Sequence, residues 1–361
     1  MNANVRNICA LVVALCGGVL GASPATKPSL RVADPMIREA LITPRAQHAG
    51  LLGVALAGQR LVAVGEHGVV LYSDDRGGTW TQAYVPVSVT LTVVRFVDQA
   101  HGWAAGHNGV VLRTTDGGAT WERILDGQDV IALYQEQAQA LAQRYGEDNE
   151  QTRRAARTAQ QFASDGPDKP WLDMSIDKSG GIWLVGAYGL ALRSHDGKQW
   201  ELWSNHLDNA SDLHLYAIKT EGNEVFIAGE QGLLMRSSDN GEHFERLVSP
   251  YKGSFFVLEV RGAEVVVAGL RGYAFRSFDR GSHFEPVALP APVNVTASLR
   301  LPDGDVVLAD QAGTLYRLAR DRLSKLGAYA GPNPSSVIAA GEEALVSVGS
   351  RGPTVSALSR P

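Results

Sequence analysis

The chain has 361 residues, of which 45% are hydrophobic, and a formal net charge of -5. The hydrophobic content is that of a globular protein that buries a core, and the mild acidity argues against nucleic acid as a partner, because phosphate binding needs concentrated cations. Both cysteines, Cys9 and Cys16, lie within the first 25 residues. The remainder of the chain can therefore form neither disulfides nor thiolate metal sites.

Residues 1–25 have the pattern of a cleaved signal peptide. Arg6 precedes an apolar stretch that ends at Leu20, and small residues follow, with cleavage sites after Ala22 or Ala25. The alternative is a membrane anchor, but the apolar stretch is shorter than the roughly 20 residues that a spanning helix needs. We therefore expect an exported protein that is periplasmic or secreted.

One unit recurs along the rest of the chain: G-x-x-G, three mostly apolar residues, Arg-Ser/Thr, and then an acidic turn that ends in Trp or Phe. Its copies begin at Gly65, Gly106, Gly186, Gly229, Gly269, Asp310 and Gly349, of which the last two lack the acidic turn. The usual spacing of about 40 residues is typical of four-stranded propeller blades, and each copy contains short, β-branched segments separated by glycine. The sequence predicts an all-β fold, a seven-bladed β-propeller over residues 34–361.

The last copy is too short to supply a fourth strand before Pro361. We expect the segment from Asp34 to Arg45, which contains Leu41 and Ile42, to supply that strand ahead of the first blade. Such closure would remove the two exposed sheet edges that an open array leaves.

The step between the second and third copies is twice as long as the others. Residues 129–164 contain no G-x-x-G and are rich in Ala, Gln, Glu and Arg, with apolar residues at helical spacing. We predict a helical hairpin inserted at 128–168 between blades 2 and 3, divided near Gly146 and overhanging the face of the G-x-x-G turns. It is either a lid packed on the blades or a docking element for an acidic partner. The docking alternative would use Arg153, Arg154 and Arg157.

Each full copy contains one aspartate in its acidic turn: Asp75, Asp116, Asp196, Asp239 and Asp279. With the glycine and the aromatic residue that follow it, this turn resembles the Asp-box of BNR repeats. A short carboxylate can accept backbone N–H groups across a turn, and the ring can pack beneath it. Because five equivalent copies cannot all be one active site, we assign these aspartates a structural role rather than catalysis or metal binding.

The complete unit, G-x-x-G-x-x-x-R-S/T-x-D-x-G-x-x-W/F, resembles the photosystem II stability and assembly factor family over about residues 50–320. The resemblance implies a non-enzymatic propeller that helps to assemble a membrane protein complex, with a membrane protein as its client and no cofactor. It also implies a location in the periplasm, or in the thylakoid lumen of a photosynthetic organism. We expect a monomer.

The arginine of the unit is the family feature that maps most directly, at Arg113, Arg193, Arg236, Arg276 and Arg317. These side chains would form a patch able to hold client carboxylates in bidentate geometry. Alternatively, each pairs across a hairpin with the glutamate that follows the Asp-box aromatic residue, as Glu122, Glu201, Glu245 and Glu285 follow the first four. Tyr72 and Ser356 replace the arginine in the first and seventh copies. Arg317 lacks such a glutamate and is the candidate for a free cation.

The alternative function is a glycoside hydrolase of the sialidase kind or a carbohydrate-binding propeller. A glycosidase needs two carboxylates about 5 to 10 Å apart, or a tyrosine with an arginine triad, whereas the arginines here repeat by symmetry. We therefore predict no catalytic residue and no metal site. Candidate binding residues are instead the side chains of the G-x-x-G turns that differ from copy to copy. These turns would surround the mouth of the propeller's central channel. The alternative is that these side chains are merely solvated. The candidate residues are Glu66, His67, His107, Asn108, Tyr188, Glu230, Gln231, Arg271 and Arg351.

Overall fold

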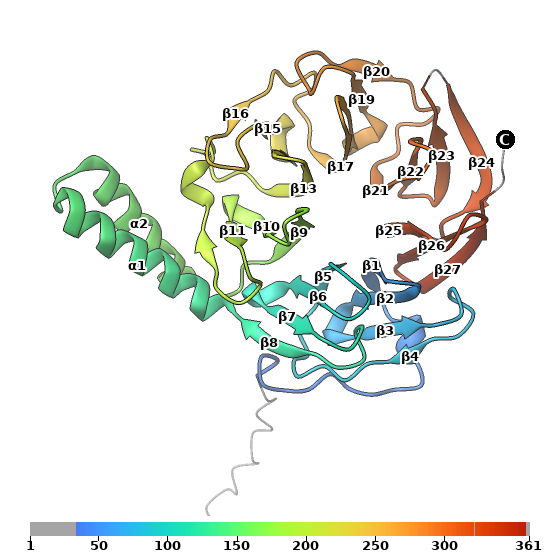
Figure 1. Cartoon of the computed structure of the whole chain (residues 1–361), viewed down its shortest axis with the longest axis horizontal. Helices are drawn as coiled ribbons and strands as arrows, with labels where there is room; N and C mark the ends of the chain where they lie inside the picture. Colours follow the sequence, from blue (N-terminus) through green and yellow to red (C-terminus); the bar gives the residue numbers. More distant parts are fainter. Residues whose placement is uncertain (1–33, 321, 359–361) are drawn as a thin grey trace, which may run out of the picture. The chain divides into compact units, whose positions relative to one another are not determined.

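Seven antiparallel sheets follow one another along the chain and form a ring in the computed structural model (Figure 1). The structure describes residues 34–320 and 322–358, so the predicted signal peptide at 1–25 lies outside the described residues. Six sheets have four strands and the last has three. The prediction of an all-β propeller fold is confirmed. We number the sheets 1 to 7 in chain order.

Strand bounds in the first four sheets are as follows. Sheet 1 contains β1 (Leu51–Ala57), β2 (Arg60–Gly65), β3 (Val70–Ser73) and β4 (Thr81–Gln82). Sheet 2 contains β5 (Leu91–Phe96), β6 (Gly102–Gly106), β7 (Val111–Thr114) and β8 (Glu122–Leu125). Sheet 3 contains β9 (Trp171–Ile176), β10 (Ile182–Gly186), β11 (Ala191–Ser194) and β12 (Glu201–Leu202). Sheet 4 contains β13 (Leu215–Glu221), β14 (Glu224–Gly229), β15 (Leu234–Ser237) and β16 (Glu245–Arg246).

The remaining sheets repeat this order. Sheet 5 contains β17 (Phe255–Arg261), β18 (Glu264–Gly269), β19 (Ala274–Ser277) and β20 (Glu285–Val287). Sheet 6 contains β21 (Val295–Arg300), β22 (Val306–Asp310), β23 (Thr314–Leu318) and β24 (Leu323–Tyr329), and sheet 7 contains β25 (Pro334–Ala339), β26 (Ala344–Gly349) and β27 (Gly352–Ala357). Short 3-10 turns are η1 (Ala46–His48), η2 (Glu66–Gly68), η3 (His107–Gly109), η4 (Ala187–Gly189), η5 (Ser204–His206), η6 (Glu230–Gly232) and η7 (Leu270–Gly272).

The second strand of each sheet is almost completely buried, as in β2, β10 and β18. Both faces of these strands are covered by neighbouring sheets, so their sequences are continuous apolar runs rather than alternating ones. The first strands contact one another in order around the ring, and β25 contacts β1. The core is therefore a series of seven apolar layers between adjacent sheets.

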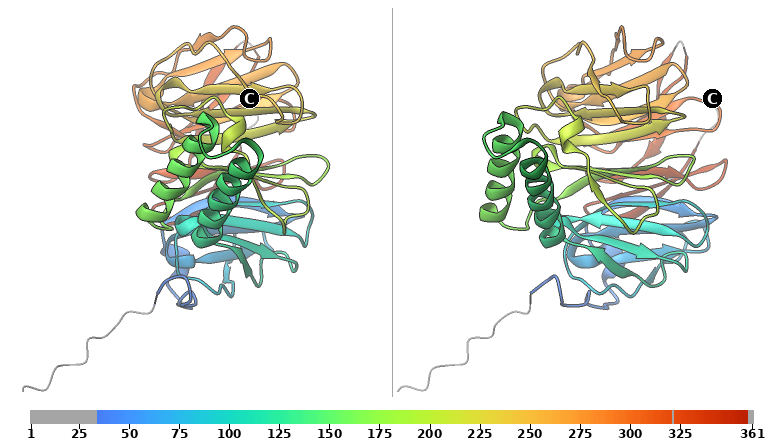
Figure 2. Two further views of the ribbon diagram at one scale, coloured as in Figure 1. Left: turned by 90° about the vertical axis from the view of Figure 1, so that its left-hand side faces the viewer. Right: turned by 60° about the vertical axis from the view of Figure 1, so that its left-hand side comes forward.

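Two helices, α1 (Gly127–Tyr145) and α2 (Glu150–Asp165), connect β8 to β9 and lie side by side at the flank of the ring (Figure 2). Asp126 and Asp129 form a capping box at the start of α1, which satisfies N–H groups that have no partner within the helix. Gly146 ends α1 with a positive φ of 80°, so the division predicted at this glycine is correct. Buried residues of both helices pack on sheet 3.

The structure contradicts the prediction that residues 34–45 complete the last sheet. This segment forms no strand and runs along sheet 1, where Ala40 donates its N–H to the carbonyl of Val85 and Gln82 bonds to both Thr43 and Leu41. Sheet 7 keeps β27 as its edge. The ring closes instead through packing, because Leu51 and Val54 share an apolar cluster with Val346 and Val348.

Within the described ranges, no helix is both long enough and apolar enough to cross a membrane.

The close contact between the Asp-box turn of sheet 4 and sheet 3 gives a first testable prediction. Gly241 has a φ of 85°, and a Cβ at this position would overlap the buried ring of Trp183. Gly222, in the same sheet, has a φ of 62° and open space around it. We expect Gly222→Ala to lower the free energy of unfolding by about 1 kcal/mol through backbone strain alone, and Gly241→Ala by about 3 kcal/mol, because overpacking adds to that strain.

Urea denaturation followed by tryptophan fluorescence measures both values. Equal losses in the two variants would show that the contact between Gly241 and Trp183 does not limit the packing.

Candidate functional site

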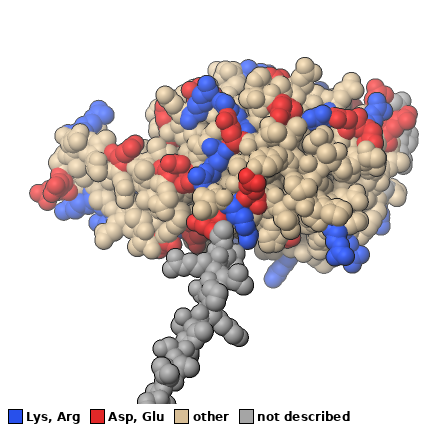
Figure 3. All heavy atoms as spheres, turned by 90° about the horizontal axis from the view of Figure 1, so that it is seen from below, with Lys and Arg blue, Asp and Glu red and all other residues tan. Residues whose placement is uncertain are grey.

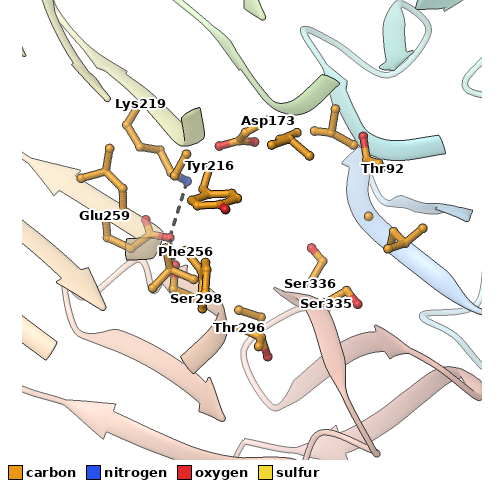
Figure 4. Close-up of a pocket in the computed structure, with 18 of the residues that line it drawn as sticks. Thr92, Asp173, Tyr216, Lys219, Phe256, Glu259, Thr296, Ser298, Ser335 and Ser336 are labelled. Atoms are coloured by element: carbon orange, nitrogen blue, oxygen red, sulfur yellow. Dashed lines mark hydrogen bonds and ion pairs between the residues drawn. The ribbon is translucent and has the colours of Figure 1, made fainter. Parts of the chain in front are cut away.

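The first strand of every sheet has a register shift near its beginning, and the residue at each shift lines the central channel. These residues are Leu52, Thr92, Leu172, Tyr216, Phe256, Thr296 and Ser335. Figure 4 shows several of them around the channel hollow, which has a volume of about 120 Å³. A bulge turns an extra side chain toward this opening, so the channel lining differs from sheet to sheet although the backbone repeats.

The buried carboxylates of the channel are held by groups from both neighbouring sheets. Asp173 of sheet 3 pairs with Arg95 of sheet 2 at 2.7 Å and accepts the backbone N–H of Ile218 of sheet 4 at 3.0 Å. Glu259 of sheet 5 pairs with Lys219 at 3.5 Å and accepts the hydroxyl of Ser298 at 2.7 Å. Asp173 and Glu259 are 8% and 5% exposed. Because a buried charge needs a partner, these pairs link sheets 2 to 6 at the channel wall.

The G-x-x-G turns place their third residue at the tip with a positive φ, as the left-handed conformation of His67, Asn108, Tyr188, Gln231 and Arg271 shows. These tips, together with Glu66, His107 and Glu230, lie at one end of their sheets, where the second strand passes to the third. Glu230 is only partly exposed and accepts the N–H of His214. The structure thus brings the predicted rim residues to the surface of one face, while their number and charge differ between sheets.

Two of the repeated arginines form the cross-strand ion pair that the sequence predicted. Arg113 contacts Glu122 at 2.6 Å. Arg236 reaches Glu245 at 3.7 Å, but its shorter contact, at 2.5 Å, is with Glu224 of the adjoining second strand. The predicted pairing is therefore complete at Arg113 and secondary at Arg236.

The other three arginines have partners that the sequence analysis did not name. The Arg193 guanidinium lies 4.5 and 4.9 Å from the ring centroids of Trp183 and Trp203, two rings that pack edge-on against each other. Its ion-pair partner is Glu242 at 3.5 Å rather than Glu201. The Arg193 side chain is only 3% exposed, so its contacts with the two indole rings replace most of its contact with water.

Arg276 pairs with the acid that begins the second strand of its sheet, and Arg317 with two acids of the turn just before the second strand of its own. Arg276 contacts Glu264 at 2.6 Å and donates to the carbonyls of Ala319 and Arg320. Arg317 contacts Asp305 at 2.6 Å and Asp303 at 2.5 Å. The prediction that Arg317 is a free cation is wrong, because two carboxylates hold it.

A sequence signal for these pairs was present and was missed. An acid lies twelve residues before Arg236, Arg276 and Arg317, at Glu224, Glu264 and Asp305. At this spacing the two side chains meet across the second and third strands, just as opposite charges pair on neighbouring strands elsewhere.

The first and seventh sheets replace the arginine differently. In sheet 1 the guanidinium of Arg60 lies over the ring of Tyr72 at 4.4 Å and pairs with Asp74, so a cation reaches the same region from the neighbouring strand. In sheet 7 the register pairs Val346 with Val355, whereas sheet 4 pairs Phe226 with Arg236. Val355, not Ser356, therefore occupies the arginine position, because the turn before β27 is shorter.

The Asp-box carboxylates hold their own turns. Asp75 accepts the backbone N–H and the hydroxyl of Thr79 and the hydroxyl of Ser73. These bonds lower the pKa of Asp75 to about 2. The pKa of Asp239 is also lowered, chiefly by the backbone N–H of His243. Asp75 and Asp239 thus accept hydrogen bonds from within their own turns.

Among residues 34–320 and 322–358, no cluster of three or more His, Cys, Asp or Glu side chains could hold a metal ion.

The ring of sheets and its repeated turns define an Asp-box β-propeller of the BNR kind. A family model described as "Photosynthesis system II assembly factor YCF48" matches residues 78–139 and 159–318, which together make up more than half of the chain. The chain therefore belongs to the Ycf48 family of photosystem II assembly factors. The gap in the match falls within α1 and α2.

Comparisons with individual proteins agree with this family. The photosystem II assembly lipoprotein Ycf48 of Synechococcus sp. (strain CC9902) is 36% identical over 77 residues, which are 21% of this chain and 23% of that protein. The aligned region thus spans about a quarter of the relative's length.

Solved structures show the same fold. A structure described as YCF48 bound to D1 peptide has a TM-score of 0.53 at 19% identity and covers 74% of this chain and 77% of that one. YCF48 from Cyanidioschyzon merolae has a TM-score of 0.60 at 13% identity, with 89% and 97% covered. The WD40 propeller domain of Doa1 has a TM-score of 0.60 at 12% identity, with 91% and 97% covered.

The stacking of Arg193 predicts that lysine cannot replace it. A lysine lacks the planar guanidinium that contacts the rings of Trp183 and Trp203, and its ammonium would be buried without full solvation. We expect Arg193→Lys to lower the free energy of unfolding by about 2 kcal/mol, an order-of-magnitude value for a desolvated cation on aromatic rings. The matched variant Arg113→Lys changes a more exposed pair and should cost less than about 0.5 kcal/mol.

Chemical denaturation measures both variants at neutral pH. A loss at Arg113→Lys as large as that at Arg193→Lys would exclude the stacking as the source of the difference.

The lowered pKa of Asp75 predicts acid sensitivity in a defined window. Its folded pKa of about 2 lies below its ordinary value of 3.8, so its stabilising effect is complete above the ordinary value and is lost as pH falls toward 2. Asp75→Asn should lower the melting temperature at neutral pH and then lose less between pH 4 and pH 2 than the parent protein. Asp148→Asn, between the two helices, should follow the parent curve. A parallel decline for Asp75→Asn and the parent would show that this carboxyl does not contribute.

Proposed function

We propose that this protein is an exported, non-enzymatic assembly factor that binds a segment of a membrane protein client while the client's complex is assembled. Family membership over more than half of the chain is the main support for this function. A propeller of the same fold is described as bound to a D1 peptide, which supports a peptide segment as the bound species. We propose further that the seven sheets are seven blades of one propeller over residues 34–361, with the helices as an insertion at 128–168.

The charge arrangement supports a binding scaffold whose specificity lies outside the repeated positions. The repeated arginines contact carboxylates or carbonyls of the chain itself. On the side seen in Figure 3, acidic and basic side chains are interspersed rather than gathered into one patch. We infer that these arginines chiefly stabilise the sheets. The client then binds the face formed by the G-x-x-G turns, whose side chains differ from sheet to sheet. If the repeated arginines bound the client, the client would have to displace the carboxylates and carbonyls that these arginines contact within the chain.

We propose that residues 1–25 are removed on export and that the mature chain acts in the periplasm, or in the thylakoid lumen of a photosynthetic organism, as a monomer without a cofactor. The relative in Synechococcus is described as a lipoprotein, which is consistent with export.

Site-specific photocrosslinking in the native envelope tests the function and the face together. A photoreactive residue at Tyr188, on a G-x-x-G turn, should capture a membrane protein that mass spectrometry identifies. The same residue at Lys198, an exposed position at the opposite end of sheet 3, is the matched control and should capture none. Recovery of only soluble proteins at both positions would overturn the assembly role, and equal capture of the client at both would overturn the choice of face.

A further inference from the structure

A cleft lies between the two helices and the ring, and neither the repeat nor the family match accounts for it. It has a volume of about 190 Å³ and is lined by Tyr134 of α1, Arg154 and Phe162 of α2, and Tyr188, Leu207 and Asp212 from the surface of the ring. A second hollow of about 410 Å³ shares Phe162, Tyr188 and Asp212 with it and opens beside Lys169. We call the two together the hairpin groove.

The floor of the groove is fixed by packing. The rings of Tyr134 and Phe162 stack at 4.3 Å between centroids, and both residues are buried. The hydroxyl of Tyr134 bonds to Ser204 of η5 at 3.2 Å, which ties α1 to the ring. A site whose floor is already ordered loses little conformational entropy when a ligand binds.

One wall of the groove is aromatic and open to solvent. Tyr188 is 52% exposed, and its backbone N–H is donated to Nδ1 of His214 at 2.9 Å. The ammonium of Lys169 lies 5.1 Å from the ring of Phe162 and 5.5 Å from that of Tyr188. Lys169 also pairs with Asp165 and Asp168. The aromatic rings at this end of the groove thus already contact a cation, and the floor formed by Tyr134 and Phe162 is left for an apolar group.

The aromatic wall continues toward the channel. Tyr188 packs edge-on against His214, His214 lies 6.1 Å from Tyr216, and Tyr216 lies 5.3 Å from Phe256. Tyr216 and Phe256 are two of the bulge residues of the channel (Figure 4). An extended chain bound in the groove would therefore find a continuous row of rings toward the channel mouth.

A cation lies at the edge of the groove. The Arg154 side chain is exposed at the edge of the cleft. Its charge acts on Asp212, which lines the same cleft: burial raises the pKa of that carboxyl, and Arg154 counteracts part of the rise. Arg153 and Arg157 lie on the same helix and are also exposed. Arginine holds a carboxylate through two parallel hydrogen bonds, so the edge fits an acidic side chain better than a neutral one.

We propose that the hairpin groove binds an extended segment of the client protein, with one apolar side chain on the floor formed by Tyr134 and Phe162 and an acidic side chain at Arg154. The cleft above this floor, at about 190 Å³, fits a single large side chain, and the adjoining hollow of about 410 Å³ leaves room for the neighbouring residues of the segment. Amide side chains of Gln137 and Asn205 line the same cleft and can bond to the backbone of the segment. The inference rests on the proposed function for the client being a protein.

Two pairs of substitutions on α2 distinguish binding in the groove from binding to the surface around it. Ala155 lines the cleft, whereas Ala156 is exposed and does not, so Ala155→Trp fills the site and Ala156→Trp is its control. Arg154→Glu reverses the charge at the edge, and Arg153→Glu makes the same change one residue away. Thermal melting should show that all four variants remain folded.

The experiment is a selection from a random nine-residue phage peptide library on the mature full chain, followed by titration of fluorescent copies of the enriched peptides. We expect a shared pattern of one apolar and one acidic residue. Ala155→Trp and Arg154→Glu should each weaken binding by at least about tenfold, which corresponds to 1.4 kcal/mol, and the two controls should bind within about twofold of the parent.

Peptides that bind Ala155→Trp as tightly as the parent would overturn the groove, as would enrichment of peptides without the acidic residue or no enrichment at all. Oligosaccharides that bind the parent and are blocked by Ala155→Trp would overturn the peptide as occupant. Failure of the assembly role is distinguishable: it would leave peptide binding intact in the purified protein but give no membrane protein on crosslinking at Tyr188. If a client is captured equally at Tyr188 with and without Ala155→Trp, the groove is not its binding site, and the proposed assembly function stands.

Discussion

The close approach of each Asp-box turn to the preceding sheet determines how the sheets pack around the ring. The glycine of the turn lies so near its neighbour that a Cβ at Gly241 would overlap Trp183, and one at Gly77 would lie 2.9 Å from Val355 of sheet 7. The turn can approach this closely because its carboxylate satisfies the backbone N–H groups inside the turn, as Asp75 does for Thr79. The same contact that joins sheets 3 and 4 therefore also joins sheets 7 and 1. This explains how the ring closes although sheet 7 has only three strands.

Most of the charge that repeats with the sheets is used internally for this packing. Arg276 bonds to Glu264 of its own sheet and to carbonyl oxygens at the outer end of sheet 6, while Asp173 and Glu259 link neighbouring sheets at the channel. A group that holds the scaffold is expensive to divert to a ligand, because its partner would be left buried and unpaired. Specific recognition is then expected where the repeat is broken, at the turn tips and the helices.

The sequence was sufficient for the sheets and for the helices because both are periodic: the glycine turns recur at a nearly constant spacing, and Gly146 divides two helical patterns. It was sufficient only in part for the arginines. Strand register brings Glu122, Glu201, Glu245 and Glu285 opposite their arginines. Register does not determine, however, which nearby acid each long arginine side chain contacts. Arg193 instead contacts the rings of Trp183 and Trp203, and Arg317 bonds to two aspartates of the loop before β22.

Other features depend on contacts between distant segments and have no local pattern. The fourth strand predicted from Asp34 to Arg45 was a topological argument, yet Ala40 found a partner in Val85 and Thr43 one in Gln82. The hairpin groove likewise arises only when Phe162, Tyr188 and Leu207 meet, each from a different element. The groove is formed by α1 and α2, which have no counterpart at the other sheets among the described residues, whereas the Asp-box contacts occur in five sheets. A symmetric scaffold can recognise an asymmetric segment only through such unrepeated features. The helices next to sheet 3 are therefore the part of the fold from which we expect selectivity for one client.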